Sequence, residues 1–387
     1  MRYQNSVFGK LIKPISRRQF AAIVPRHSGD AYDKCFKSWD HLLSLIFAQL
    51  TAADSLRGLE ALWNVNAHHH YHLGSRKLKR ATLSDANTRR PVAIFAETFE
   101  RLSTLADRRL KRQGGEILRI IDATPIPLDA LIGWADWNGR TRGLKLHVMY
   151  DPATDHARRI AVTPATVNDV LVGEQVPLEP GATYVFDKAF CKYAWWARIH
   201  DAGGFFVTRP KSNVTYTVIR RRTLTATRGD QFTVLSDAEV RLQTQGRAKL
   251  AMPLRYVRVR RDAGGSLSII TNDLQRPAVE IAAIYKARWQ IELLFRWIKQ
   301  HLRLKKFLTR AESGIRLQII AAMIAYLLLR LAARDSRLAI PAIRFAELIS
   351  ACLFIRKSLA RLDKPPDVHP SRPHPYFSAT QFALSYD

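Results

Sequence analysis

Three acidic residues lie where their side chains could bind metal ions. Asp122 and Asp187 each follow an apolar run typical of a buried strand, in "EILRIIDATPI" and "TYVFDKAF". Glu292 is the one carboxylate in "YKARWQIELLFRWIKQ", which also carries four Lys or Arg residues. Hard divalent cations prefer oxygen ligands, and two such ions can stabilise the attacking and leaving oxygens of a phosphodiester. Together the three acids indicate metal-dependent phosphoryl transfer.

Each aspartate also has an ordinary structural interpretation. Taken alone, Asp122 or Asp187 is typical of a residue that starts a turn or caps a helix. Asp169, in "TPATVNDV", is an alternative to Asp187 because it too follows a predicted strand. We therefore predict Asp187 as the second acid and keep Asp169 in reserve.

The segment around Glu292 predicts a helix with one polar stripe. At about 100° per residue, Tyr285, Arg288, Glu292, Arg296 and Lys299 fall on one narrow face, and the rest of the circumference is mostly apolar. Glu292 could simply form pairs one turn away with Arg288 and Arg296. A polar stripe on an otherwise buried helix nevertheless favours a phosphodiester backbone and a metal ion, which would engage cations and acid together.

The chain is strongly basic. Among its 387 residues, 61 are Lys or Arg and 33 are Asp or Glu, which gives a formal net charge of +28 at pH 7. This balance favours a nucleic-acid partner because each phosphate neutralised releases a condensed counterion. An acidic membrane surface is the alternative, but neither an amphipathic basic helix nor a lipid signal stands out. The absence of Walker and dinucleotide-binding motifs disfavours NTP use and nicotinamide redox chemistry.

Several features predict a cytosolic protein without a zinc centre. The three cysteines are far apart, the N-terminus has no apolar signal core, and the longest apolar run, 319–329, predicts a buried helix too short to span a bilayer. His68 and His72 are spaced as a possible metal pair, but no cysteine or acid nearby could complete a zinc shell. We expect neither zinc nor a membrane partner.

The order of predicted elements indicates an α/β (α+β) fold. After a helical, basic N-terminal region come three antiparallel strands, then helix, strand, helix and strand, and a block of β-prone runs precedes the helix of Glu292. We predict a helical DNA-binding region at 1–112, a mixed core at 113–211, a β-rich insertion at 212–275, the Glu292 helix and a buried helix at 276–335, and a C-terminal helical region with a Pro-rich tail at 336–387.

The three acids resemble the DDE triad of bacterial insertion-sequence transposases. Tyr285, Arg288, Glu292 and Lys299 match the Y-(2)-R-(3)-E-(6)-K signature of the IS-four family. The segments "SWDHLLSLIFAQLTAADSLRGLE", "TLSDAN" and "GLKLHVMYD" also resemble segments of this family. The resemblance therefore extends over nearly the whole chain.

The resemblance implies a fold, a reaction and partners. The implied fold is a ribonuclease-H-like catalytic core with a β-rich insertion before the last catalytic helix. Two Mg²⁺ or Mn²⁺ ions held by the three acids would support cleavage at transposon ends, hairpin formation, reopening and strand transfer. The implied partners are double-stranded transposon ends and target DNA, with a homodimer assembled on paired ends. A catalytically inactive DNA-binding derivative and a ribonuclease-H-like nuclease without joining activity are the alternative functions.

Further side chains are expected to contact DNA. By resemblance, the Tyr, Arg and Lys of the signature lie beside the cleaved bond, and Arg288 is suited to bidentate phosphate binding. Trp289 could stack on a displaced base, or could be a core residue. The complete set of expected DNA contacts is Tyr285, Arg288, Trp289, Arg296, Lys299, Arg209 and Lys211.

Overall fold

The N-terminal region is helical, as predicted. The computed structural model describes residues 5–31, 33–51, 53–110, 116–243, 250–302, 304 and 306–365. Serine side chains start several of the first helices, because Ser6, Ser16 and Ser55 each accept a hydrogen bond from a backbone N–H of the first turn. The elements are α1 (Val7–Ile12), α2 (Arg17–Arg26), α3 (Ser38–Leu50), α4 (Leu56–Asn64), η1 (Ala67–His69), α5 (His70–Leu73), α6 (Arg80–Arg89) and α7 (Val92–Arg109).

A single mixed sheet forms the rest of the framework. Its strands in the described residues are β1 (Ile117–Pro127), β2 (Gly143–Asp151), β3 (His156–Pro164), β4 (Ala182–Val185), β5 (Phe205–Thr208), β6 (Tyr216–Arg221), β7 (Arg228–Gly229), β8 (Phe232–Leu242), β9 (Leu254–Arg261) and β10 (Ser266–Thr271). They lie in the order β3-β2-β1-β4-β5-β10-β9-β8-β6, and β7 pairs with β8. Strands β1, β2 and β3 are antiparallel, whereas β4 and β5 run parallel to β1. This arrangement is the predicted ribonuclease-H-like core.

The predicted β-rich insertion extends the core sheet instead of forming a separate layer. Strand β10 pairs antiparallel with β5, and β9, β8 and β6 follow outward from it. Arg255 of β9 donates two hydrogen bonds to Asp237 of β8, at 2.8 and 2.6 Å, and both side chains are 2% exposed. This buried pair fixes β8 against β9 within the insertion, and β10 joins the insertion to the core strand β5.

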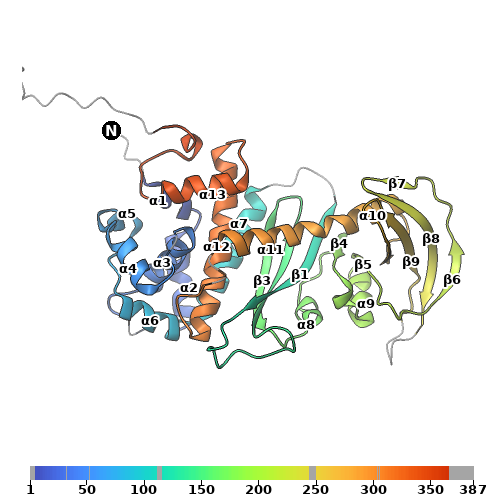
Figure 1. The fold of residues 1–387 in the computed structure, drawn as a ribbon, viewed down its shortest axis with the longest axis horizontal. Helices are drawn as coiled ribbons and strands as arrows, with labels where there is room; N and C mark the ends of the chain where they lie inside the picture. Colours follow the sequence, from blue (N-terminus) through green and yellow to red (C-terminus); the bar gives the residue numbers. More distant parts are fainter. Residues whose placement is uncertain are drawn as a thin grey trace, which may run out of the picture.

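Helices cover both faces of the sheet. On one face, α8 (Asp169–Gly173) and α9 (Tyr193–Asp201) pack over an aromatic cluster that includes Trp195 and Trp196. On the other, α10 (Ala278–Ala287) and α11 (Trp289–His301) run one after the other across the sheet (Figure 1). The Glu292 helix thus lies over the core strands, where the predicted acids are.

Helix α12 (Glu312–Ser336) joins the helical region to the core. It packs against α3, α6, α7 and β3 (Figure 1). By length and composition it could cross a membrane, but 89% of its most apolar window is buried inside the protein. The run 319–329 is therefore part of a buried core helix, as predicted, although that helix is longer than the run alone suggested.

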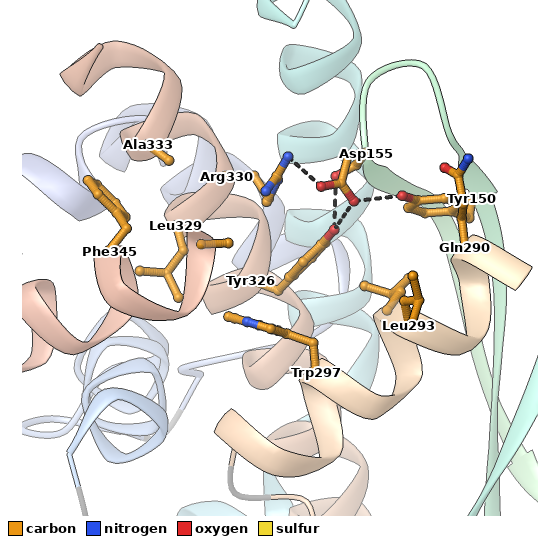
Figure 2. A pocket seen from close by; sticks show the side chains of 12 residues that line it. Tyr150, Asp155, Gln290, Leu293, Trp297, Tyr326, Leu329, Arg330, Ala333 and Phe345 are labelled. Carbon is orange, nitrogen blue, oxygen red and sulfur yellow. Dashed lines mark hydrogen bonds and ion pairs between the residues drawn. The ribbon is translucent and has the colours of Figure 1, made fainter. Parts of the chain in front are cut away.

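The side of α11 away from Glu292 packs on α12. A hollow of about 400 Å³ lies there, lined by Leu293 and Trp297 of α11 and Tyr326 of α12 (Figure 2). At its edge Asp155 accepts hydrogen bonds from the hydroxyls of Tyr150 and Tyr326 and forms an ion pair with Arg330. Because Asp155 lies between β2 and β3, these contacts tie the core hairpin to α12.

The C-terminal elements return to the beginning of the chain. After α12 come α13 (Ala342–Ala351) and η3 (Leu359–Arg361), and the backbone N–H groups of Val7 and Phe8 donate to the carbonyls of Ile355 and Leu353, at 2.9 and 2.7 Å. The proposed boundary between 112 and 113 and the tail after 365 lie outside the described residues. The domain boundaries therefore stay predictions.

Candidate active site

The register of the core strands places Asp122 and Asp187 side by side. Ile120 of β1 pairs with Val185 of the parallel strand β4, and each aspartate follows two residues later. Side chains two residues apart point to the same face of a strand. Ile120 and Val185 belong to the core cluster that contains Ile291 of α11. Both aspartates are therefore directed to the face that α11 covers.

Asp122 is a partly buried carboxylate among other charges. Its Oδ1 accepts the N–H of Ala123 at 2.8 Å, and its Oδ2 accepts Nη1 of Arg288 at 3.0 Å. The pKa of Asp122 is raised to about 6, mainly by burial and also by the carboxylates of Asp187 and Glu292, against the lowering effect of these two donors. Asp187 and Glu292 are thus each close enough to Asp122 to repel its charge.

Asp187 has a capping contact as well as a place beside Asp122. Its Oδ1 accepts the N–H of Ala189 at 2.7 Å and so caps the short helix η2 (Lys188–Phe190). Its carbonyl oxygen accepts the hydroxyl of Thr208 at 3.2 Å. The capping role considered from the sequence is present, and it fixes the side chain at the end of β4.

The helix that carries Glu292 is interrupted, contrary to the prediction of one continuous helix. Helix α10 ends at Ala287, α11 begins at Trp289, and the N–H of Arg288 bonds to the carbonyl of Tyr285, three residues back, at 3.1 Å. This tight turn is invisible to a pattern based on regular helical spacing. Arg288 nevertheless reaches Glu292, because its Nη2 donates to Oε1 at 2.6 Å.

Tyr285 and Arg209 lie next to the acids. Burial raises the pKa of Tyr285, while Arg288, which also hydrogen-bonds to it, and Arg209 lower that pKa. Val207 of β5 pairs with Val185 of β4, so the exposed Arg209 is level with Asp187. Asp122, Asp187 and Arg209 therefore lie at equivalent positions of, or just beyond, the adjacent strands β1, β4 and β5.

Other predicted DNA contacts lie farther from the acids. Lys299, two turns beyond Glu292, lines a hollow of about 560 Å³ with Lys306 and with Gln49 of the N-terminal region. Arg296 is exposed, and the backbone of Lys211 bonds to Cys191. Trp289 is 51% exposed, so the alternative of a core tryptophan is wrong.

Asp169 lies on the opposite face of the sheet. Its carboxylate accepts Nζ of Lys145 at 2.9 Å and is 4.0 Å from Nδ1 of His147. Both partners alternate along β2 with Leu146 and Val148, whose side chains belong to the core cluster under α11. The structure therefore brings Asp187, and not Asp169, to the face that carries Asp122.

The donor set suits a hard divalent cation, but the carboxylates are not gathered as a metal shell. Among the described residues, no three His, Cys, Asp or Glu side chains stand close enough to hold an ion, and the His68–His72 segment is no exception. The guanidinium of Arg288 lies between Asp122 and Glu292 instead. Asp122, whose pKa is raised in part by the carboxylates of Asp187 and Glu292, nevertheless lies among the oxygen ligands that a divalent cation would stabilise.

The bridging position of Arg288 was missed by the sequence analysis. Its contact with Glu292 could be read from the spacing of four residues. Its contact with Asp122 joins residues 166 positions apart, and nothing in the local pattern reports it.

Comparison with known proteins identifies relatives across most of the chain. The family described as "Transposase DDE domain" matches residues 113–328, and a domain of unknown function matches residues 3–76. A Sinorhizobium fredii protein named as a candidate transposase, y4zB, is 52% identical over 304 residues, which are 79% of this chain and 85% of that protein. A protein of Geobacillus stearothermophilus, named as a probable transposase for insertion sequence element IS5377, is 28% identical over 264 residues, 67% of each chain.

Among solved structures, a piggyBac transposase synaptic complex with hairpin DNA is similar. Its TM-score is 0.47, and the alignment covers 95% of this chain and 84% of that chain at 10% identity.

Proposed function

This chain belongs to the DDE-domain transposases of insertion sequences, and from that premise we propose that it binds terminal inverted repeats and catalyses metal-dependent DNA cleavage and strand transfer. We further assign it to the IS-four family through the signature residues Tyr285, Arg288, Glu292 and Lys299. The cycle would be cut-and-paste, with a hairpin formed at the transposon end. Two protomers would assemble on paired ends, in the bacterial cytoplasm at the nucleoid.

One observation carries this proposal. Asp122 and Asp187 stand level on adjacent parallel strands, and Glu292 projects towards them from the helix that crosses the sheet. Each acid is held by a rigid element, so the three can act as one group. The raised pKa of Asp122 supports their proximity, because both other carboxylates contribute to it.

The roles of the side chains follow from their positions. Asp122, Asp187 and Glu292 would hold Mg²⁺ or Mn²⁺, two ions in all, which supply an activated water or 3′-hydroxyl and neutralise the leaving oxygen. Arg209, exposed at the end of β5, would bind a phosphate beside the cleaved bond. Trp289 is exposed one residue past the helix break, where it could stack on a displaced base.

More distant cations would hold the flanking duplex. Arg296 continues the exposed side of α11, and Lys299 lies where α11 approaches the N-terminal region. Residues 1–112 would read the terminal repeat, and the net charge of +28 supports extended contact with phosphates. Lys211 is exposed three residues beyond the end of β5 and would join this set.

The function is tested by incubating the full chain with duplexes that carry the DNA flanking its gene. We expect a nick at the transposon end that requires Mg²⁺ or Mn²⁺, stops with a chelator, and resumes when Mn²⁺ is restored. A pre-cleaved end should then be inserted into a plasmid. Equal binding with and without Mn²⁺ and no nicking would favour the inactive DNA-binding derivative, whereas nicking without insertion would favour a nuclease.

A further inference from the structure

One cation of the signature, Arg288 at the turn between α10 and α11, lies among the acids instead of on the protein surface. Arg288 donates from Nη1 to Asp122 and from Nη2 to Glu292, at 3.0 and 2.6 Å. The Arg288 side chain is 17% exposed, and the side chains of Asp122 and Glu292 are 18% and 32% exposed. Tyr285 forms a third contact with the same guanidinium. Arg288 is therefore the bridge between two of the three proposed metal ligands.

We propose that Arg288 closes the cation site of the free protein, and that a DNA phosphate opens this site by taking the guanidinium away from Asp122 and Glu292. The inference rests on the proposed function, since it assumes that these carboxylates hold divalent ions. It adds an order to the events: cations enter the site with the DNA and not before it.

The physical reason is competition for the same oxygens. The guanidinium occupies one oxygen of each carboxylate and places a positive charge between them. A divalent ion at that position would be repelled by this charge at short range in a partly desolvated site. The guanidinium and a divalent ion therefore cannot both be bound to these two carboxylates. Because arginine binds phosphate strongly and with two hydrogen bonds, a DNA phosphate can remove the guanidinium from the carboxylates and leave them to the ion.

Arg288 also borders a second site, away from the acids, where its guanidinium could bind a phosphate. The residue stands at the turn between α10 and α11 and also borders a hollow of about 490 Å³, together with Trp289 and Arg261 of the insertion. A phosphate at the rim of this hollow would meet two arginines and an exposed aromatic ring. Asp262, which also lines the hollow, is paired with Arg228. A change in the side-chain conformation of Arg288 would then move its guanidinium from Asp122 and Glu292 to the phosphate.

Such an exchange couples the binding of DNA to the binding of divalent cations. If DNA releases the carboxylates, DNA tightens cation binding, and cations must tighten DNA binding by the same factor. The free transposase would be kept from holding ions, and hence from cutting DNA that does not present a phosphate at Arg288.

The test measures Mn²⁺ binding to the full chain by titration calorimetry, with and without a transposon-end duplex. Arg288→Met removes the charge but keeps the aliphatic stem, so we expect it to bind Mn²⁺ without DNA roughly tenfold more tightly than the wild type. Added duplex should tighten Mn²⁺ binding by the wild type about tenfold, but leave the affinity of Arg288→Met nearly unchanged.

Lys286→Met is the matched control. It removes one positive charge two residues away, from a side chain that pairs with Asp230 of the insertion and does not contact the acids. It should leave Mn²⁺ affinity without DNA as in the wild type. If Arg288→Met fails to fold, Arg288→Lys keeps a charge but cannot bridge both carboxylates, and should tighten Mn²⁺ binding by roughly threefold.

Two outcomes would overturn the inference, and they are distinguishable. Mn²⁺ binding that depends on Glu292 but is equal in the wild type and in both Arg288 variants would remove Arg288 as the closing residue and leave the proposed function standing. Absence of Mn²⁺ binding in every form, even with duplex, would remove the metal site itself and the proposed function with it.

Discussion

Glu292→Gln is expected to reduce strand cleavage by at least about a thousandfold while DNA binding stays within a factor of about two. The amide keeps the shape of the side chain and its oxygen can still accept from Arg288, so α11 should remain in place. It lacks the negative charge that a divalent ion requires. The measurement is single-turnover nicking of a labelled transposon end, with gel mobility shift for binding.

The control for Glu292 is an acid on the preceding helix. Glu280 is exposed in the first turn of α10, so Glu280→Gln makes the same chemical change outside the site. It should cleave at the wild-type rate. Retained cleavage by Glu292→Gln would exclude Glu292 from the catalytic group.

Asp187→Asn should abolish cleavage to a similar extent, whereas Asp169→Asn should leave it nearly intact. Asn caps helices about as well as Asp, so the contact with the N–H of Ala189 should survive and only the charge beside Asp122 is lost. Asp169 pairs with Lys145 on the other side of the sheet, so the loss of its charge should lower the stability of the protein without removing a ligand from the proposed site. Nicking rates and thermal unfolding of the two variants provide the measurement.

These two variants distinguish Asp187 from Asp169 as the second acid of the site. Both aspartates follow strands and both occupy the start of a helix, so their neighbours in sequence do not separate them. The reverse result, with cleavage lost in Asp169→Asn and kept in Asp187→Asn, would mean that the ions bind on the opposite face.

The core was predictable because its signals are local. Alternation in "GLKLHVMYDP" and the apolar runs before Asp122 and Asp187 each indicate a strand. The ribonuclease-H-like arrangement was implied by the resemblance to insertion-sequence transposases, and the strand order β3-β2-β1-β4-β5 agrees with it. Pairing of β10 with β5 was not predictable, because it joins segments about 60 residues apart. The continuation of the core sheet through the insertion therefore emerged only from the structure.

The site was predictable in its members but not in its arrangement. Residue types and spacing indicated Asp122, Glu292 and Arg288, but strand register was needed to prefer Asp187 over Asp169. Regular helical spacing could not reveal the break at Arg288, since a tight turn keeps nearly the same angular positions. These features depend on contacts between distant segments.

The most direct test of the account is anomalous X-ray diffraction from crystals of the protein bound to a transposon-end duplex and soaked in Mn²⁺. Manganese peaks within about 2.5 Å of carboxylate oxygens of Asp122, Asp187 and Glu292, with Arg288 moved onto a DNA phosphate, are the predicted result. Manganese bound elsewhere, with the three carboxylates apart and Arg288 still between Asp122 and Glu292, would contradict it.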